Sequence, residues 1–509
     1  MSDQFERQVT DLTRREFLGR GTALAGWSAL GWGMTLESVA KARAAGVTSL
    51  PAAADMLPSY VADVTGNGIP GNADKTLVRK LIGAKRGLEV LAKGGYDYRG
   101  DVFGRARVSN DDLKAVQKAL KHLKGNPKDM RPRPVTIGWH YAWYNHANRK
   151  PNKQHVWFKD GGYSSRDPAT EAMFNDLKNE FGITVDAVSW ADPSADKNLN
   201  ENFELGYMQA ANGKTRHTAL LYESLISLRA KPGDRIDFGR KKTRNRLVNH
   251  FRGMARTFVQ FRDDSRVRIF TVDGRPVILI YASHTWATNV DGTGTQYDRI
   301  DEAMENAINA FAKIYGKAPF VIGEEMTFAE TDRFDEGRQR RSANFDGVFI
   351  YHHAATPDFI VRGGQNLRAP YIAQVREVLR NSYAAMSHKS RFTDRPMLIV
   401  PSFAAGFSKV QVPTLHGNRI DYANFLKEMI RFHEREYLAR AFGENALTKR
   451  PAIFSVGAWN EEWEGHAVMP SQFNRTLSPR TQQGFDYVMA IKQACGWNHY
   501  SERQLDLRT

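Results

Sequence analysis

Short apolar runs and longer helical stretches alternate along the chain from residue 135 onward. The runs are rich in branched aliphatic and aromatic residues, which favours buried strands, and the stretches between them have the periodicity of amphipathic helices. The predicted strands are residues 135–143, 185–190, 218–223, 277–284, 320–325, 347–352, 398–403 and 452–459. Eight strands alternating with helices predict an α/β fold, a (β/α)8 TIM barrel, over residues 135–509.

Side chains that can carry chemistry follow the predicted strands. The active site of a (β/α)8 barrel lies at the C-terminal ends of its strands. Aromatic, histidine and carboxylate residues stand at nearly every one of these ends. The candidates for lining a site are Trp190, Tyr222, Glu223, His284 and Tyr351. Ordinary packing at the rim is the alternative for each of them.

A metal site is another interpretation of these strand ends. Glu324 and Glu325 end the fifth strand, and His352 and His353 end the sixth. Adjacent residues on a strand point to opposite faces, so His352 and His353 cannot both face one ion without a bulge. We therefore expect that catalysis in the barrel requires no cofactor.

Two related segments precede the barrel. Asp63 leads to Asp74 and Asp101 leads to Asp112, both at an offset of eleven, and the copies lie 38 residues apart. Asp therefore occupies positions 1 and 12 of an EF-hand-type calcium loop in each copy. The predicted calcium ligands of the first copy are Asp63, Thr65, Asn67, the Ile69 carbonyl and Asp74.

A helical pattern follows each loop, and the pair resembles a dockerin tandem, a small calcium-dependent module. The resemblance covers roughly residues 55–125 and implies an all-α module, bounded at 45–125, with a structural calcium and a protein partner. Gly and Pro residues predict a linker to the barrel at 126–134. The second copy has Phe103, Arg105 and Arg107 where oxygen ligands are expected, so we expect one calcium at most. A metal-free helical hairpin is the alternative.

The N-terminus carries an export signal. Residues 13–18 read Thr-Arg-Arg-Glu-Phe-Leu, a twin-arginine motif, and a mildly apolar run follows at 21–36. Processing after Ala44 would remove residues 1–44. The alternative, an anchoring helix, is disfavoured because the run is short and rich in Gly, Ala, Ser and Thr. The sequence predicts a periplasmic or extracellular protein, exported folded, without an integral membrane segment after processing.

The cysteine count excludes an intramolecular disulfide, and the net charge indicates the class of binding partner. Cys495 is the one cysteine, so no intramolecular disulfide can form. The formal charge of +16 becomes +15 after processing, because residues 1–44 carry six Lys/Arg and five Asp/Glu. This excess favours anionic partners. No nucleic-acid-binding motif accompanies it, so an acidic polysaccharide or envelope surface is preferred over nucleic acid.

The segment after the eighth predicted strand, residues 458–465, reads Ala-Trp-Asn-Glu-Glu-Trp-Glu-Gly. Cleavage of a glycosidic bond uses a pair of carboxyl groups, with aromatic faces to hold the sugar. The catalytic candidates are Glu461 and Glu464. The candidates for binding substrate beside them are Trp459, Asn460, Glu462 and Trp463. A solvated acidic turn is the alternative.

This segment is similar to the Trp-Asn-Glu-Trp-x-Glu-Gly motif of glycoside hydrolase family 99 and of WbsX-type, family 99-like proteins. The stretch 272–281, Val-Asp-Gly-Arg-Pro-Val-Ile-Leu-Ile-Tyr, resembles a strand of the same family. The resemblance spans residues 135–470 and implies a (β/α)8 barrel that cleaves internal α-mannosidic linkages with retention and without a metal.

The resemblance also implies roles for two glutamates. Glu461 would act as base on the sugar 2-hydroxyl, giving a 1,2-anhydro intermediate, and Glu464 as acid and then base. Glu462 occupies the place of the family's Trp, and Trp463 is displaced by one residue. Glu462 therefore remains an alternative partner for Glu464.

Three hypotheses follow for function. The first is an exported retaining endo-acting glycoside hydrolase, endo-α-mannosidase-like, that cleaves an α-linked polysaccharide or oligosaccharide, either acidic or neutral. The second is a noncatalytic carbohydrate-binding barrel attached through a calcium module. The third is a WbsX-type polysaccharide glycosyltransferase, which export disfavours because activated sugar donors are largely cytoplasmic.

Overall fold

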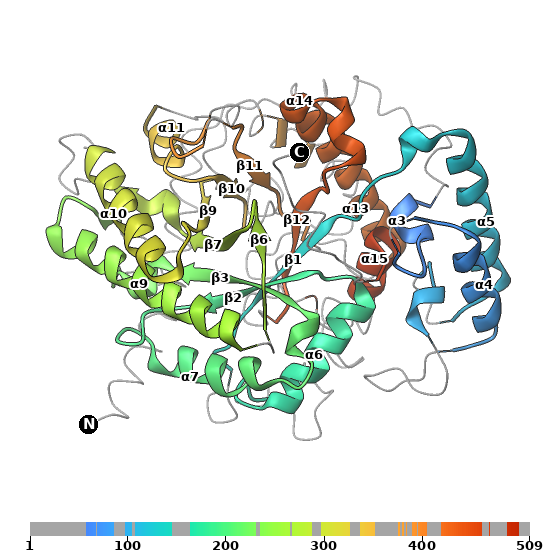
Figure 1. Cartoon of the computed structure of the whole chain (residues 1–509), viewed down its shortest axis with the longest axis horizontal. Helices are drawn as coiled ribbons and strands as arrows, with labels where there is room; N and C mark the ends of the chain where they lie inside the picture. The colour runs from blue at the N-terminus through green and yellow to red at the C-terminus, as the bar shows by residue number, and fades with distance from the viewer. Residues whose placement is uncertain are drawn as a thin grey trace, which may run out of the picture.

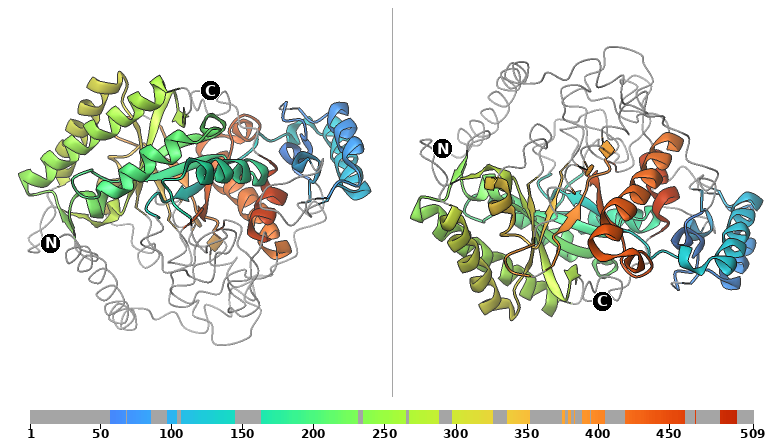
Figure 2. Two further views of the ribbon diagram at one scale, coloured as in Figure 1. Left: turned by 90° about the horizontal axis from the view of Figure 1, so that it is seen from below. Right: turned by 90° about the horizontal axis from the view of Figure 1, so that it is seen from above.

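The structure is a computed structural model (Figure 1). It describes residues 57–67, 69–85, 97–103, 107–144, 163–230, 235–264, 267–287, 297–325, 336–351, 375–376, 379–380, 383, 389–393, 395–404, 419–460, 468 and 486–497. A barrel domain forms the larger part, and a helical module stands beside it (Figures 1 and 2).

Eight parallel strands form the barrel, which confirms the predicted fold class. The strands are β1 (Val135–His140), β2 (Val185–Trp190), β3 (His217–Glu223), β7 (Arg275–Tyr281), β9 (Phe320–Glu324), β10 (Gly347–Phe349), β11 (Leu398–Val400) and β12 (Ile453–Ala458). They pair in the order β11-β10-β9-β7-β3-β2-β1-β12. Ser402 bridges to Ser455, and the Ser455 amide donates to the Pro401 carbonyl at 2.8 Å, which joins β11 to β12 and closes the barrel.

Helices cover the outside of the barrel (Figure 1). They are α6 (Pro168–Phe181), α7 (Lys197–Leu205), α9 (Lys241–Asp263), α10 (Tyr297–Tyr315), α11 (Glu336–Ser342), α13 (Arg419–His433), α14 (Ala439–Phe442) and α15 (Asp486–Cys495). Sequence sets their ends. Asp167 caps α6 by accepting from the Ala169 and Thr170 amides, and Gly182 ends it with φ of 81°.

The strands are apolar on both faces. Leu221, Leu279 and Ile322 belong to the cluster that fills the barrel, whereas Leu220 and Ile278 belong to the cluster under α9 and α10. This arrangement is expected of parallel strands that are covered on both sides. The consequence is that neighbouring residues on one strand serve different layers.

A buried ionic network lies between α6 and the strands β1 and β2. The Lys178 ammonium is 2.8 Å from Asp186, and Arg216 is 3.3 Å from the same carboxylate. His140 meets Glu171 at 3.2 Å, and all five side chains have no exposed surface. Burial alone would raise the pKa of Asp186, but the charges of Arg216 and Lys178 hold that pKa well below its ordinary value. Removing one partner would leave a buried charge uncompensated.

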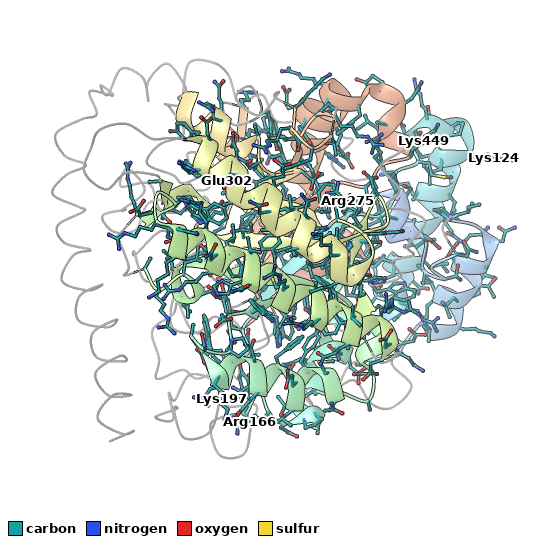
Figure 3. The ribbon with its side chains drawn as sticks, turned by 60° about the vertical axis from the view of Figure 1, so that its left-hand side comes forward. Lys124, Arg166, Lys197, Arg275, Glu302 and Lys449 are labelled. Carbon is teal, nitrogen blue, oxygen red and sulfur yellow. The ribbon has the colours of Figure 1, made fainter. Side chains whose placement is uncertain are left out.

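An ion pair and a hydrogen bond join neighbouring strands at the end of the barrel where the strands begin. Arg275 begins β7 and donates to Asp346 at 2.9 Å (Arg275 is labelled in Figure 3). The same carboxylate accepts from the Val321 amide at 2.9 Å. These contacts align β7, β9 and the residue before β10 where the strands begin.

The N-terminal module contains the short helix α3 (Ser59–Ala62) and two longer helices, α4 (Asn72–Leu81) and α5 (Asn110–Gly125). The helices predicted after each loop are thus present. Within the predicted linker 126–134, Arg133 is buried and donates to the Cys495 carbonyl at 3.0 Å. Trp497 donates to the Val64 carbonyl at 3.0 Å, so the module is fixed to the end of α15.

No helix in the described ranges is both long enough and apolar enough to cross a membrane.

Candidate active site

Two carboxylates and a tyrosine lie side by side at the mouth, the end of the barrel formed by the strand C-termini. Glu223 ends β3 and is in register with Tyr281, the last residue of β7. Glu324 ends β9, one residue beyond Gly323, which pairs with Ile280 of β7. Three neighbouring strands therefore present Glu223, Tyr281 and Glu324 at one level. A (β/α)8 barrel places its chemistry at this position.

Glu324 is the carboxyl with the most unusual environment. It is nearly fully buried, and its Oε2 accepts a hydrogen bond from the Ala282 amide at 2.6 Å. Burial raises the pKa of Glu324 to about 8; the Ala282 hydrogen bond opposes this, and the charges of Glu325 and Glu223 add to it. The side chain is therefore a neutral acid near pH 7, able to donate a proton or a hydrogen bond.

The turn after β7 holds Glu324 in place. Ala282 has φ of 59°, a left-handed conformation that is costly for a residue with a side chain. This conformation points the Ala282 amide at the carboxylate. The next residue, Ser283, donates from its hydroxyl to the Glu324 carbonyl at 2.8 Å. His284 follows, with Nδ1 3.8 Å from Glu324 Oε2 and a quarter of its side chain exposed.

Glu223 is held from the neighbouring strand. The Ser189 hydroxyl of β2 donates to Glu223 Oε1 at 2.7 Å, and both side chains are buried. Its charge is one of the causes that raise the pKa of Glu324. Two carboxyl groups thus influence each other at the mouth, and one of them, Glu324, is neutral near pH 7.

An aromatic wall faces these carboxylates. The hydroxyls of Tyr141 and Tyr351 are 2.6 Å apart, and the ring of Tyr281 lies edge-on to Tyr351 at 5.4 Å. Trp143 stacks on Tyr141 with ring centroids 4.3 Å apart and planes at 21°. Trp143 is only half-buried, so part of its surface remains accessible. A stacked, partly exposed indole is suited to the face of a sugar ring.

Asn460 anchors the chain where the acidic segment begins. Its Nδ2 donates to the Tyr141 carbonyl at 2.8 Å and to the Tyr163 hydroxyl at 2.9 Å, and its Oδ1 accepts from the Tyr141 amide at 2.8 Å. The fully buried side chain thus pins the end of β12 to the end of β1. Asn460 acts as a positioning residue at the mouth.

Three of the predicted binding residues are placed behind the strands. Trp459 is fully buried, with its ring 5.7 Å from Phe174 and 5.1 Å from the Lys178 ammonium. Tyr222 donates or accepts at 2.7 Å with His250 of α9, and Trp190 lies over Gly253 of the same helix. Because side chains alternate along a strand, Tyr222 faces α9 when Glu223 faces the mouth. The structure does not bring these three to the mouth.

The mouth does hold other predicted residues. Glu223, His284 and Tyr351 lie there, as the strand-end argument predicted. Glu461, Glu462, Trp463 and Glu464 lie outside the described residues, as do His352 and His353. The mouth residues that the sequence argument did not select are Glu324, Tyr141, Tyr281 and Trp143. The same criterion could have selected them, since all four stand near the ends of predicted strands.

Glu325 has a structural partner. Arg341 donates to both of its oxygens, at 2.8 and 2.9 Å, and the carboxylate has no exposed surface. Glu324 and Glu325 therefore face different layers. Within the described part of the chain, no three His, Cys, Asp or Glu side chains gather closely enough to hold a metal ion.

The first predicted calcium loop brings its oxygen atoms together. The Thr65 hydroxyl donates to Asp74 Oδ1 at 2.9 Å and lies 3.4 Å from Asp63 Oδ1. Asp63 also accepts from the Gly66 and Asn67 amides at 2.9 and 3.1 Å. Asp63 and Asp74 are buried, and Asn67 Oδ1 accepts from the Ile69 amide. Hard oxygen donors in this grouping fit calcium, which remains a prediction.

The last Asp of each loop also has a structural role. Asp74 accepts from the Gly71 amide and forms a capping box at the start of α4. Asp112 accepts from the Ser109 amide at 2.8 Å and does the same for α5. Helix capping alone accounts for these two residues, so they do not by themselves argue for a metal.

Comparisons with known proteins concern the fold. No family model and no curated protein matches the chain. A solved structure titled a glycoside hydrolase-like protein is 13% identical, with a TM-score of 0.50, over 71% of this chain and 94% of that one. Two structures of a GH99 endo-alpha-mannosidase from Bacteroides thetaiotaomicron, one of them with bis-tris propane, are 15% and 16% identical, with TM-scores of 0.43 and 0.41. They cover 70% and 71% of this chain and 95% of theirs. The first of these likenesses supports the barrel architecture.

Proposed function

We propose that this protein is an exported, retaining, endo-acting glycoside hydrolase, endo-α-mannosidase-like, that cleaves an α-linked polysaccharide. The observation that supports it most is the mouth itself. It combines a carboxyl with a pKa raised to about 8, Glu324, with a second carboxyl, Glu223, and an aromatic wall. Carboxyl groups at the mouth can hydrogen-bond sugar hydroxyls, and an aromatic surface can hold a sugar ring beside the reacting pair, as glycoside hydrolysis requires.

In this proposal the reacting carboxyl groups are Glu461 and Glu464. Glu464 is the acid that protonates the leaving oxygen and then the base that activates water, and Glu461 removes the proton of the 2-hydroxyl. Asn460 supports this assignment because its clamp on Tyr141 holds the residue immediately before Glu461 at the mouth. Glu324, as a neutral acid, donates a hydrogen bond to a substrate hydroxyl, and Trp143 stacks on a neighbouring sugar ring.

The proposal is tested by incubating the mature protein with a panel of α-linked glycans. Wild type should release internal fragments, detected by mass, and NMR of the first product should show a retained anomeric configuration. Glu464→Gln should abolish turnover while the circular dichroism spectrum and melting temperature stay unchanged. Full activity in Glu464→Gln would overturn the assignment.

Two further variants identify the partner of Glu464. Glu461→Gln and Glu462→Gln differ only in which neighbouring carboxyl is lost. If Glu461 is the base, its variant loses turnover by a factor of about a thousand, whereas Glu462→Gln remains within about tenfold of wild type. The reverse result would transfer the role to Glu462. Glycan binding without cleavage across the panel would favour the noncatalytic hypothesis, and product formed only with a sugar nucleotide would favour the transferase.

A further inference from the structure

A cationic segment runs from the connection after β3 into the first turns of α9, next to the mouth. The described stretches 229–230 and 235–246 contain seven Arg or Lys and one Asp, a net charge of +6 by difference. We call these stretches the β3–α9 cationic segment. Its cations are Arg229, Arg235, Arg240, Lys241, Lys242, Arg244 and Arg246.

Strand pairing fixes this segment at the rim. β4 (Ile236–Asp237) lies inside it and pairs with β8 (Trp286–Ala287), which follows the turn after β7. The Phe238 amide also donates to the Ala287 carbonyl at 2.7 Å. Both connections leave the C-terminal ends of their strands, as Glu223 and Tyr281 do. The cationic segment is therefore on the mouth side of the barrel.

Most of this charge is not neutralised by the described residues. Asp237 pairs with Arg240 at 3.0 Å. Arg235, Lys241 and Lys242 are exposed, and none of them forms an ion pair with a described carboxylate. Arg244 donates to the Phe238 and Gly239 carbonyls at 2.7 and 2.8 Å. These acceptors are neutral, so they do not compensate the positive charge of Arg244.

The cations also stand where helix electrostatics disfavours them. α9 begins at Lys241, has no acidic residue in its first turn and has no side-chain cap. The N-terminal end of a helix carries a partial positive charge, so cations there are unfavourable. By contrast, α7 begins with the Asp196 carboxylate accepting from the Leu199 amide. Stability does not explain the composition of this segment, whereas an anionic ligand does.

We infer that the β3–α9 cationic segment binds acidic groups, carboxylate or sulfate, on the polysaccharide that enters the mouth. This inference rests on the proposed function and names its substrate class. The charge of Glu223 would repel an acidic group at the mouth centre, so the acidic groups lie on flanking sugar units. The substrate is an anionic polysaccharide whose charged units flank the cleaved bond.

A matched pair of glycans and a matched pair of variants test this inference. Polygalacturonate carries a carboxylate on each unit, and its methyl ester has the same backbone without the charge. Lys241→Glu with Lys242→Glu reverses two charges at the rim. Lys313→Glu with Lys317→Glu reverses two exposed lysines near the C-terminal end of α10, where Lys317 lies beside Gly274 before β7, away from the mouth. Figure 3 shows α9 and α10 side by side, with Glu302 of α10 labelled.

Binding is measured by affinity electrophoresis and calorimetry at low and at raised salt. Wild type should bind polygalacturonate and not the ester, with affinity falling as salt increases because exposed charges are screened. The rim variant should lose about tenfold in affinity, equivalent to about 1.4 kcal/mol, and the α10 variant less than about twofold. Equal binding of the two glycans, or an equal loss in both variants, would overturn the inference. Binding without cleavage of any glycan would instead count against the proposed hydrolase and leave the cationic segment supported.

Discussion

Glu324→Gln isolates the cost of burying one carboxyl at the mouth. The amide has the size of the acid, stays neutral at every pH, and keeps an oxygen that can accept from the Ala282 amide. In wild type, burial raises the pKa of Glu324 from 4.5 to about 8. Between these values the folded protein holds the proton more tightly than the unfolded chain. The stabilisation from the bound proton is complete below pH 4.5 and is lost as the pH rises through 8.

The size of the pKa shift of Glu324 sets the size of the expected difference in unfolding free energy. A difference of about 3.5 pKa units corresponds to about 5 kcal/mol of unfolding free energy, most of it lost between about pH 5 and pH 8. Glu324→Gln has no proton to lose. Its unfolding free energy should therefore equal that of wild type near pH 5 and exceed it by about 5 kcal/mol above pH 8.

The assay is urea unfolding of both proteins across this pH range. The difference between them removes the contribution of every other titrating group. Glu434→Gln is the matched control, because burial raises the pKa of Glu434 to about 7 and its carboxylate lies 3.9 Å from Arg131, beside the start of β1 and away from the mouth. This control should show its own pH-dependent difference and keep wild-type turnover. A difference between Glu324→Gln and wild type that stays constant with pH would refute the reasoning.

Three further predictions concern the clamp, the sugar platform and the N-terminal loop. Asn460→Ala leaves the amide and carbonyl of Tyr141 without their partner and should lower the unfolding free energy by about 2–4 kcal/mol, measured by urea unfolding; a loss below about 1 kcal/mol would contradict the clamp. Trp143→Ala should raise KM about tenfold with little change in melting temperature, because the ring is only half-buried; unchanged KM would remove it from the site. Calcium at about 1 mM should raise the melting temperature of wild type but not of Asp63→Ala, and a chelator should reverse the shift; no calcium effect on wild type would leave the loop a metal-free turn.

The order and number of the barrel strands could be predicted from the sequence. Apolar runs separated by amphipathic stretches gave eight strands, and the structure has a strand in each, with β2 matching at both ends. The helices of the N-terminal module follow the two loops, as the helical pattern predicted, and in the structure Ser109 and Asp112 form the capping box at the start of α5. These features depend on contacts between residues close in the chain, which is why local pattern suffices.

Which of two adjacent strand residues faces the mouth could not be predicted from the local pattern. Glu223 faces the mouth and Tyr222 faces α9, and Glu324 faces the mouth while Glu325 pairs with Arg341. A strand covered on one face shows which residues point inward by alternating polar and apolar positions. Strands of a parallel barrel are buried on both faces and lack that alternation, so the phase of the pleat cannot be read from them.

The sequence by itself therefore determined that this chain forms a (β/α)8 barrel and that carboxylate, histidine and aromatic residues stand at its mouth. Only the tertiary structure decided which of them meet. It turned Trp459 toward α6, used Asn460 to join β12 to β1, and gave Glu324 a pKa of about 8. The physical reason is that burial, and the proximity of Glu223 and Ala282, arise from strands far apart in the chain and exist only once the barrel has closed.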